Sequence, residues 1–254
     1  MKIFTLLNKN KWKIGGILFW IFIWELFSYV IGEEILFVSP ISTFKRLLEL
    51  IVMKDFCGTV FFSFSRIALG FTLAFVIGIF LSILSWNKKF IRILIEPLIT
   101  LIQVVPVASF IIISLIWIDS KNLSIFISFL MVCPIIYRNT LNGIENTDKE
   151  LLEMADVFKI SKEKKVKYIY AQSVKPFLIS ACTVSLGLCF KAGIAAEVIG
   201  IPNGSLGEKI YESKIYLYTG DLFAWTIVIV LISVIFQRLF LKVLNLTFFK
   251  MENG

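Results

Sequence analysis

Charged residues inside apolar stretches are the first candidates for chemistry in this sequence. Glu25 lies in one such stretch, and Lys191 and Glu197 lie in another. An ionisable side chain is costly in an apolar environment unless it is paired or hydrated, so it commonly marks an ion pair or a solute pathway. Two interpretations stay open for Lys191: an ion pair with Glu25, or a pathway position attractive to an anionic or strongly polar solute. Glu197 is expected at an outer gate or at a contact with a solute receptor.

Other kinds of chemistry lack the residues that they need. The chain has no histidine, which removes His-based acid–base catalysis and His-ligated metal sites. Its cysteines show no metal-ligand or disulfide spacing, and no Gly-x-x-x-x-Gly-Lys-Ser/Thr phosphate loop occurs. We therefore expect no enzyme activity and no metal or cofactor bound by this chain. The sequence also offers no site for ATP hydrolysis by this chain.

The elements that must position these residues are helices that span a membrane. Of 254 residues, 58% are hydrophobic and 17% are charged, and a spanning helix needs roughly 20 predominantly apolar residues. Residues 111–118 are apolar on every face, whereas a barrel strand would alternate. The sequence predicts an all-α polytopic membrane protein, a single membrane domain over residues 1–254. About six transmembrane helices are expected, at residues 14–31, 67–86, 97–118, 122–137, 176–200 and 222–245.

Polar residues and prolines interrupt two of these predicted spans. Gln103 and Pro106 lie in the third span, and Pro134 lies in the fourth. A proline frees backbone groups or kinks a helix, which a membrane tolerates where helices line a cavity. Packing is the default role of these residues, but Gln103 and Pro106 join Lys191 as candidates for lining a pathway.

Positive charge gathers in the segments that fall on one side of the predicted spans. These are the N-terminal tail, residues 88–92, the long loop at residues 138–175 and the C-terminal end. Such segments are typically cytoplasmic, so both termini are expected in the cytoplasm, and the net charge of +8 does not call for a nucleic-acid partner. The first span carries no small-x-small cleavage signature and is expected to be retained. The tail lysines are Lys2, Lys9, Lys11 and Lys13.

Two polar segments are predicted to form amphipathic helices. After Ser39, a typical helix cap, residues 40–51 should form a packing strut on the outer surface. In the long loop, Leu151, Ala155 and Phe158 recur at i, i+4 and i+7, and a second helix should follow a turn near Lys159. Amphipathicity alone leaves an ordinary positively charged loop as an equal alternative.

The spacing of residues in this loop resembles a known motif. Glu153-x-Ala155, followed by Lys159, Ile169 and Pro176, is similar to the EAA loop in permease subunits of binding-protein-dependent ABC importers. Motifs at residues 139–144, 196–200 and 205–207 resemble the nitrate/taurine/aliphatic-sulfonate branch of that family. The similarity runs from residue 39 to the last span. Two positions depart from the pattern: Lys159 replaces a glycine, and Gln172 replaces a proline.

The resemblance implies a type I ABC importer permease fold, with its core at about residues 57–245 and a cytoplasmic coupling loop at about residues 139–176. In this family a helix of the loop seats in a groove of the ATPase subunit. The implied partners are an ABC ATPase, an extracytoplasmic solute-binding protein and a second permease, in the bacterial cytoplasmic membrane. The residues implied in the ATPase contact are Leu151, Leu152, Glu153, Ala155, Phe158 and Lys159.

Several questions stay open at this point. The implied solute is a small anion such as nitrate, taurine or another sulfonate, although related permeases also serve pyrimidine vitamin precursors. The second permease could be an identical or a different chain. An ion-coupled secondary transporter, or a membrane anchor or assembly subunit that transports nothing, would also explain several spans and a docking loop.

Overall fold

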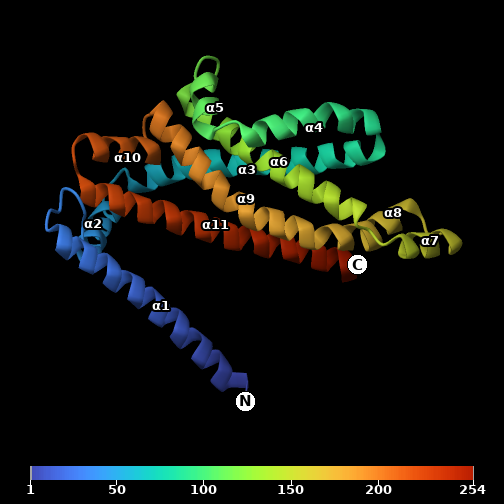
Figure 1. The fold of residues 1–254 in the computed structure, drawn as a ribbon, viewed down its shortest axis with the longest axis horizontal. Coiled ribbons are helices and arrows are strands. Elements are labelled where there is room, and N and C mark those ends of the chain that lie inside the picture. Colours follow the sequence, from blue (N-terminus) through green and yellow to red (C-terminus); the bar gives the residue numbers. More distant parts are fainter. Residues whose placement is uncertain (1, 254) are drawn as a thin grey trace. The chain divides into compact units, whose positions relative to one another are not determined.

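Every regular element that the structure describes is helical, as the sequence predicts. The structure is a computed structural model that describes the backbone of residues 2–253 and the side chains of residues 15–252. The tail lysines therefore lie outside the described side chains. The elements (Figure 1) are α1 Lys2–Ile31, α2 Pro40–Ile51, α3 Phe56–Asn87, α4 Lys89–Val104, α5 Val107–Ser114, α6 Ser120–Glu145, α7 Lys149–Val157, α8 Lys162–Lys165, the π-helical turn η1 Val166–Tyr170, α9 Ala171–Gly200, α10 Leu206–Ile215 and α11 Thr219–Asn253.

The chain divides into two compact units. The first contains the chain up to Gly58 together with Lys209–Val228. The second contains Thr59–Glu208 together with the chain from Ile229 onward. The interpretation of residues 1–254 as one membrane domain stays a prediction.

Four helices among the described residues are long and apolar enough to cross a membrane. They are Phe56–Asn87, Ser120–Glu145, Lys162–Gly200 and Thr219–Glu252. Helices α4 and α5 form a bent pair that would add a fifth span, and the apolar part of α1, Gly15–Ile31, is shorter. Each of the six predicted spans therefore has a helical counterpart in the structure.

The third predicted span is wrong as a continuous helix. Helix α4 ends at Val104 and α5 begins at Val107, with a bend of 103° between them. Pro106 has no backbone N–H, and Val105 before it takes an extended conformation (φ −70°, ψ 132°) because the proline ring disfavours a helical residue there. By contrast, α6 continues through Pro134.

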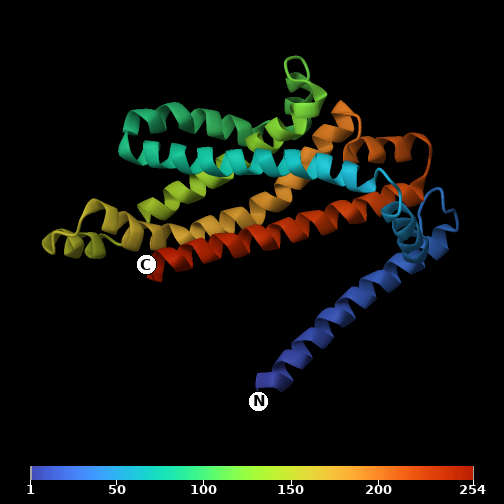
Figure 2. The ribbon, with the colours of Figure 1, turned by 180° about the vertical axis from the view of Figure 1, so that it is seen from behind.

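The core of the second unit is the contact of α6 with α9, which lie side by side in both ribbon views (Figures 1 and 2). Ser128 of α6 donates a hydrogen bond from its Oγ to the carbonyl of Cys189 in α9, at 3.3 Å. Gly70 of α3 lies against the same stretch of α6, where a Cβ atom would overlap the Ile125 carbonyl and lie 2.9 Å from Ser128 Cβ. Small residues therefore bring these helices to backbone contact, as is typical of membrane bundles.

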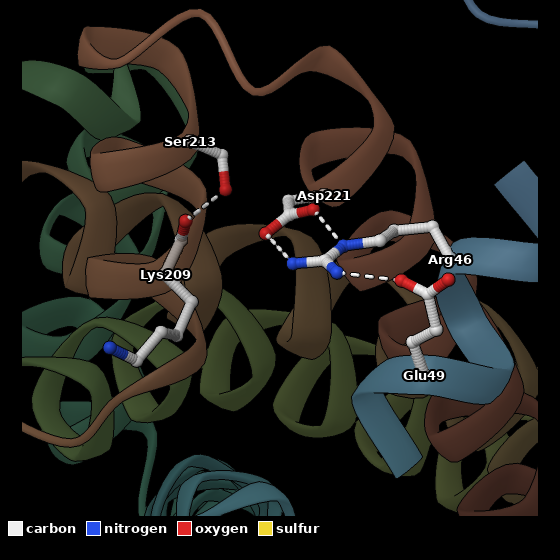
Figure 3. Close-up of polar contacts among 5 residues, drawn as sticks. All are labelled: Arg46, Glu49, Lys209, Ser213 and Asp221. Atoms are coloured by element: carbon white, nitrogen blue, oxygen red, sulfur yellow. Dashed lines mark hydrogen bonds and ion pairs between the residues drawn. The ribbon is translucent and has the colours of Figure 1, made fainter. Parts of the chain in front are cut away.

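In the first unit, α2 has the predicted cap and is fastened by a charged contact. The Ser42 backbone N–H donates to Ser39 Oγ at 3.1 Å, which caps the helix. Arg46 of α2 forms a two-point hydrogen-bonded ion pair with Asp221 of α11, and its Nη1 also donates to Glu49 at 2.7 Å (Figure 3). The bonds to Asp221, and next to Glu49, raise the pKa of Arg46 above its ordinary value. These contacts support the interpretation of α2 as a packing strut.

The close approach at Gly70 generates a stability prediction. Gly70→Ala should lower the stability of the protein by about 1–3 kcal/mol, because the added methyl meets backbone that cannot move aside. Gly187→Ala is the matched control, since a Cβ there has no neighbour within 4 Å; it should be neutral or stabilise α9 by up to about 1 kcal/mol. Thermal unfolding in detergent or nanodiscs measures both. Equal midpoints for the two variants would contradict the close packing of α3 on α6.

Candidate functional site

Helix α7 stands apart from the candidate spans and begins at a defined cap. Asp148 accepts a hydrogen bond from the Glu150 backbone N–H at 2.9 Å, so its side chain satisfies one of the free amides at the helix start. The helix ends at Val157, and α8 follows after a short turn. The predicted order of helix, turn near Lys159 and second helix is confirmed.

The turn after α7 has the geometry that usually requires glycine. Lys159 lies in the left-handed region with φ +54°. The Ile160 N–H donates to the Ala155 carbonyl at 2.9 Å, and the Lys159 N–H donates to the Asp156 carbonyl at 3.0 Å. This pair of bonds is a Schellman motif, which satisfies the last carbonyls of a helix. The lysine accepts this conformation at a cost of about 1–2 kcal/mol relative to the right-handed region. An ion pair between Lys165 and Asp156 also crosses the turn.

The surface of α7 is unusually apolar for a polar segment. Phe158 at the helix end is 72% exposed and Val157 is 79% exposed, while Leu151 and Met154 are about half exposed, at 45% and 48%. Glu153 is exposed among them. Contiguous exposed apolar side chains commonly mark a surface that binds another protein or a membrane. We refer to Leu151, Glu153, Met154, Val157 and Phe158 as the α7 surface.

Of the six residues implied in the ATPase contact, four are exposed: Leu151, Glu153, Phe158 and Lys159. Leu152 is half buried. Ala155 is fully buried, so its side chain packs against the rest of the chain and is not accessible to a partner. Contact of these residues with a partner stays a prediction. Sequence reasoning did not select Val157 or, as a contact residue, Met154. Leu151, Met154 and Phe158 follow one another at helical spacings of three and four, which was the available signal.

Glu197 in α9 is the second candidate position, and its side chain is fully buried. Ser63 of α3 donates from its Oγ to Glu197 Oε2 at 2.6 Å, and the Gly207 N–H donates to the same oxygen at 3.3 Å. The Leu206 N–H in turn donates to Ser63 Oγ at 2.8 Å. The carboxylate therefore fastens the start of α10 to α3 and α9.

The loop between α9 and α10 is built around this carboxylate. Ile201 ends α9 in the left-handed region at φ +46°. A side chain at Gly207 would overlap Glu197 itself and lie 2.5 Å from the Val198 nitrogen, so only glycine fits there. Because Glu197 has no exposed surface, it can act on an outer gate only through the loop that it holds; that role stays a prediction.

The remaining candidate positions fall in different places. Lys191 is exposed on α9, Gln103 and Pro106 are exposed at the break between α4 and α5, and Glu25 is half buried in α1. Lys191 belongs to the second unit and Glu25 to the first. Their ion pair therefore stays a prediction.

Several apolar helices, one of them broken inside an apolar stretch, together with an exposed amphipathic helix outside them, define a polytopic membrane protein. Residues 74–245 match the family of binding-protein-dependent transport system inner membrane components, and the chain belongs to this family. The family consists of transport components and is not one of enzymes. Its description agrees with a multi-pass membrane protein.

The chain is similar to permeases with several named solutes. It is 25% identical to a putative aliphatic sulfonates transport permease protein, SsuC, of Bacillus subtilis (strain 168), covering 85% of this chain and 77% of that one. The bicarbonate transport system permease protein CmpB of Synechococcus elongatus is 24% identical, over 89% and 84%. The nitrate import permease protein NrtB of the same organism is 26% identical, over 75% and 72%. These similarities confirm the predicted family resemblance.

A solved structure confirms the fold. The crystal structure of an amino acid ABC transporter with histidines matches with a TM-score of 0.57 and 18% sequence identity, over 77% of this chain and 94% of that chain. The chain therefore has the type I ABC importer permease fold.

The left-handed turn generates a prediction about α7. Lys159→Gly should remove the steric penalty and slow hydrogen exchange of the Ile160 amide about fivefold, which corresponds to about 1 kcal/mol. Lys159→Ala removes the same charge but keeps the Cβ atom, so it should show no such gain. Hydrogen exchange followed by mass spectrometry compares the two. Equal protection in both variants would show that the conformation at Lys159 carries no cost.

The buried network generates a prediction about α10. Glu197→Ala leaves the Ser63 hydroxyl and the Gly207 N–H without their acceptor, at about 1–3 kcal/mol for each donor left unsatisfied. Exchange of the Leu206 and Gly207 amides should accelerate, and the unfolding midpoint should fall. Glu212→Ala, which removes an acid of a partly exposed ion pair with Lys209, is the control and should change stability by less than about 1 kcal/mol. Unchanged exchange at residues 206–207 would contradict the fastening role.

Proposed function

We propose that a separate ATPase subunit drives this permease through the α7 surface, and that the imported solute is a small anion delivered by an extracytoplasmic binding protein. The chain is a permease subunit of an ABC importer, as its family and relatives show. The proposal names the surface through which the ATPase acts on the permease, and the class of solute that the permease carries.

The exposed apolar side chains of α7 are the single observation that carries this proposal. Phe158 and Val157 are largely exposed beside Glu153, on a helix outside every candidate span. Large apolar residues in water are stabilised by a partner that covers them, and protein interfaces concentrate their binding energy in such residues. The cap at Asp148 and the Schellman turn hold this surface in one conformation, which reduces the entropy lost on docking.

The connection from α7 into the membrane supports a mechanical role. Helix α8, the turn η1 and α9 continue without a break as Lys162–Gly200, one of the candidate spans. A closing ATPase that displaces α7 would therefore also move the start of this long helical stretch. Within the stretch, α9 packs along α6. The chain contains no phosphate loop of its own, so the proposed source of the displacement is ATP hydrolysis in the partner.

The position of the chain's end supports a cytoplasmic location for α7. Lys175 near the start of α9 forms an ion pair with Glu252 near the end of α11, with 3.6 Å between Nζ and Oε2. Figures 1 and 2 show the C-terminal end of α11 beside α8 and α9. Both segments are rich in lysine, which favours the cytoplasmic side. We propose that this end of the second unit and both termini face the cytoplasm.

The number of subunits and the solute complete the proposal. The four or five apolar spans among the described residues enclose little space, so we propose that two permease copies form the pathway between them. The named relatives carry aliphatic sulfonates, bicarbonate and nitrate, all of which are small anions. A small anion is therefore the proposed class of solute, and the binding protein is expected to choose among them.

The matched pair Glu153→Lys and Glu163→Lys tests the α7 surface. Both reverse an exposed acidic residue, but Glu163 lies on α8 outside that surface. Glu153→Lys should weaken ATPase binding about tenfold, the effect of losing about 1.4 kcal/mol at an interface, and reduce solute-stimulated ATP hydrolysis in proteoliposomes. Co-purification of the ATPase from native membranes measures binding directly. The Glu163→Lys variant should retain both.

Two outcomes would contradict the proposal. Normal co-purification and normal stimulated hydrolysis with Glu153→Lys would place the coupling surface elsewhere. Uptake that continues without ATP and stops when the membrane potential is removed would favour an ion-coupled carrier over an ATP-driven importer.

A further inference from the structure

Lys191 is a charged residue in the apolar part of α9 that the described fold leaves without a partner. Its side chain is exposed, and no hydrogen bond or ion pair joins it to another of the side chains at residues 15–252. At 1.5 Å per helical residue, it lies about 14 Å along α9 from Gly200 and about 22 Å from Pro176. An extended lysine side chain cannot reach across either distance.

An unpartnered lysine in contact with lipid tails would be expensive at this depth. Insertion into the centre of a spanning helix costs about 2.5–3.5 kcal/mol for such a residue even with local water defects. The charge must therefore meet water, a counter-charge or an anion. The surface around it distinguishes among these possibilities.

The face of α9 that carries Lys191 does not have the composition of a lipid-facing surface. One, two and three turns before Lys191 on this face lie Gly187, Val184 and Ser180, and a side chain added at Gly187 would meet open space. Apart from Val184, these residues are small or polar. The exposed side chains of α11 in the same unit are large and apolar, as expected against lipid: Val230, Leu231, Ile235, Leu239 and Val243.

A second, independent feature lies beside this face. Ile102 and Val107, on either side of the break between α4 and α5, pack against the cluster that contains Ala192 and Ala196 of α9. Helices α5 and α9 are in contact, so the break and the turn of α9 that follows Lys191 border the same cluster. A break leaves backbone groups unpaired, and a membrane tolerates these only where protein or water satisfies them. The exposed Gln103 at the break supplies a further polar group.

We propose that Lys191 lines a hydrated part of the translocation pathway and supplies the positive charge that attracts a small monovalent anion such as a sulfonate or nitrate. The inference rests on the proposed function, because it requires that this chain encloses a pathway. It assigns to one residue the preference for anions over cations, whereas the binding protein chooses among anions.

A charge-reporting cysteine tests this inference without ATPase or binding protein. Gly187→Cys places a thiol one turn from Lys191 in open space, in a chain where the exposed Cys57 is replaced by serine. Membrane vesicles containing the full chain are treated with anionic sulfonatoethyl methanethiosulfonate and with its cationic trimethylammonioethyl analogue. The anionic probe is itself a small sulfonate. The rates are compared with Lys191 present, in Lys191→Met and in Lys191→Arg.

We expect both probes to reach the thiol, with a ratio of anionic to cationic rates that falls in Lys191→Met and is restored in Lys191→Arg. One unit charge about 6 Å away changes the rate for each singly charged probe about threefold in water, in opposite directions. Leu239→Cys on the apolar face of α11 should react with neither probe. The Lys191→Arg variant also shows that loss of the effect does not come from misfolding.

Two results would overturn the inference. If neither probe modifies Gly187→Cys, this face of α9 meets lipid or another helix. If the probes react but the ratio is the same in Lys191→Met, the charge of Lys191 is neutralised, as an ion pair with Glu25 would do. Neither result depends on the ATPase, so the α7 proposal fails or stands separately.

Discussion

The interior of a bilayer offers no hydrogen-bond partner, and this absence shapes almost every feature of the chain. Backbone groups of α3, α6, α9 and α11 are satisfied within their own helices. Some polar side chains on these helices also bond to the backbone of their own helix. Hydroxyl groups of Thr72, Ser82, Thr183 and Thr226 each donate to the carbonyl four residues earlier. These four hydroxyl groups therefore need no partner on another helix.

Other polar side chains bond across helices, as Ser128 does to the Cys189 carbonyl and Tyr137 to Ser85. Three candidate positions also depart from local satisfaction: the helix bends between α4 and α5, Lys191 carries a charge, and Glu197 binds donors from α3 and α10. Helix association in the membrane has little hydrophobic drive, so close packing must supply it. Gly193 of α9 shows how close this packing is, since a Cβ there would lie 2.6 Å from Ile67 and 2.7 Å from Ser128 Oγ.

Local features were the ones that sequence reasoning could predict. The helical class, the cap at Ser39 and the turn at Lys159 follow from residues within a few positions of one another. The third span shows the limit of this reasoning: the helix breaks at Pro106, whereas α6 continues through Pro134, and the residue type is the same at both positions. Ser63 could not be assigned to Glu197 from sequence, because 134 positions separate them. Burial of Ala155 likewise depends on packing beneath α7, which its periodicity cannot reveal.

A single helix connects the three sites discussed above. The rod of Lys162–Gly200 begins beside α7, carries Lys191 along its length and ends at the Glu197 network. The π-helical turn η1 and Pro176 both lie near the α7 end of this stretch, and the helix continues through them to Gly200. A force applied at α7 would therefore move the proposed anion-attracting charge and the loop before α10 together. Under the proposed function, the helix that follows α7 therefore carries both the proposed pathway residue Lys191 and the Glu197 side chain that holds the loop before α10.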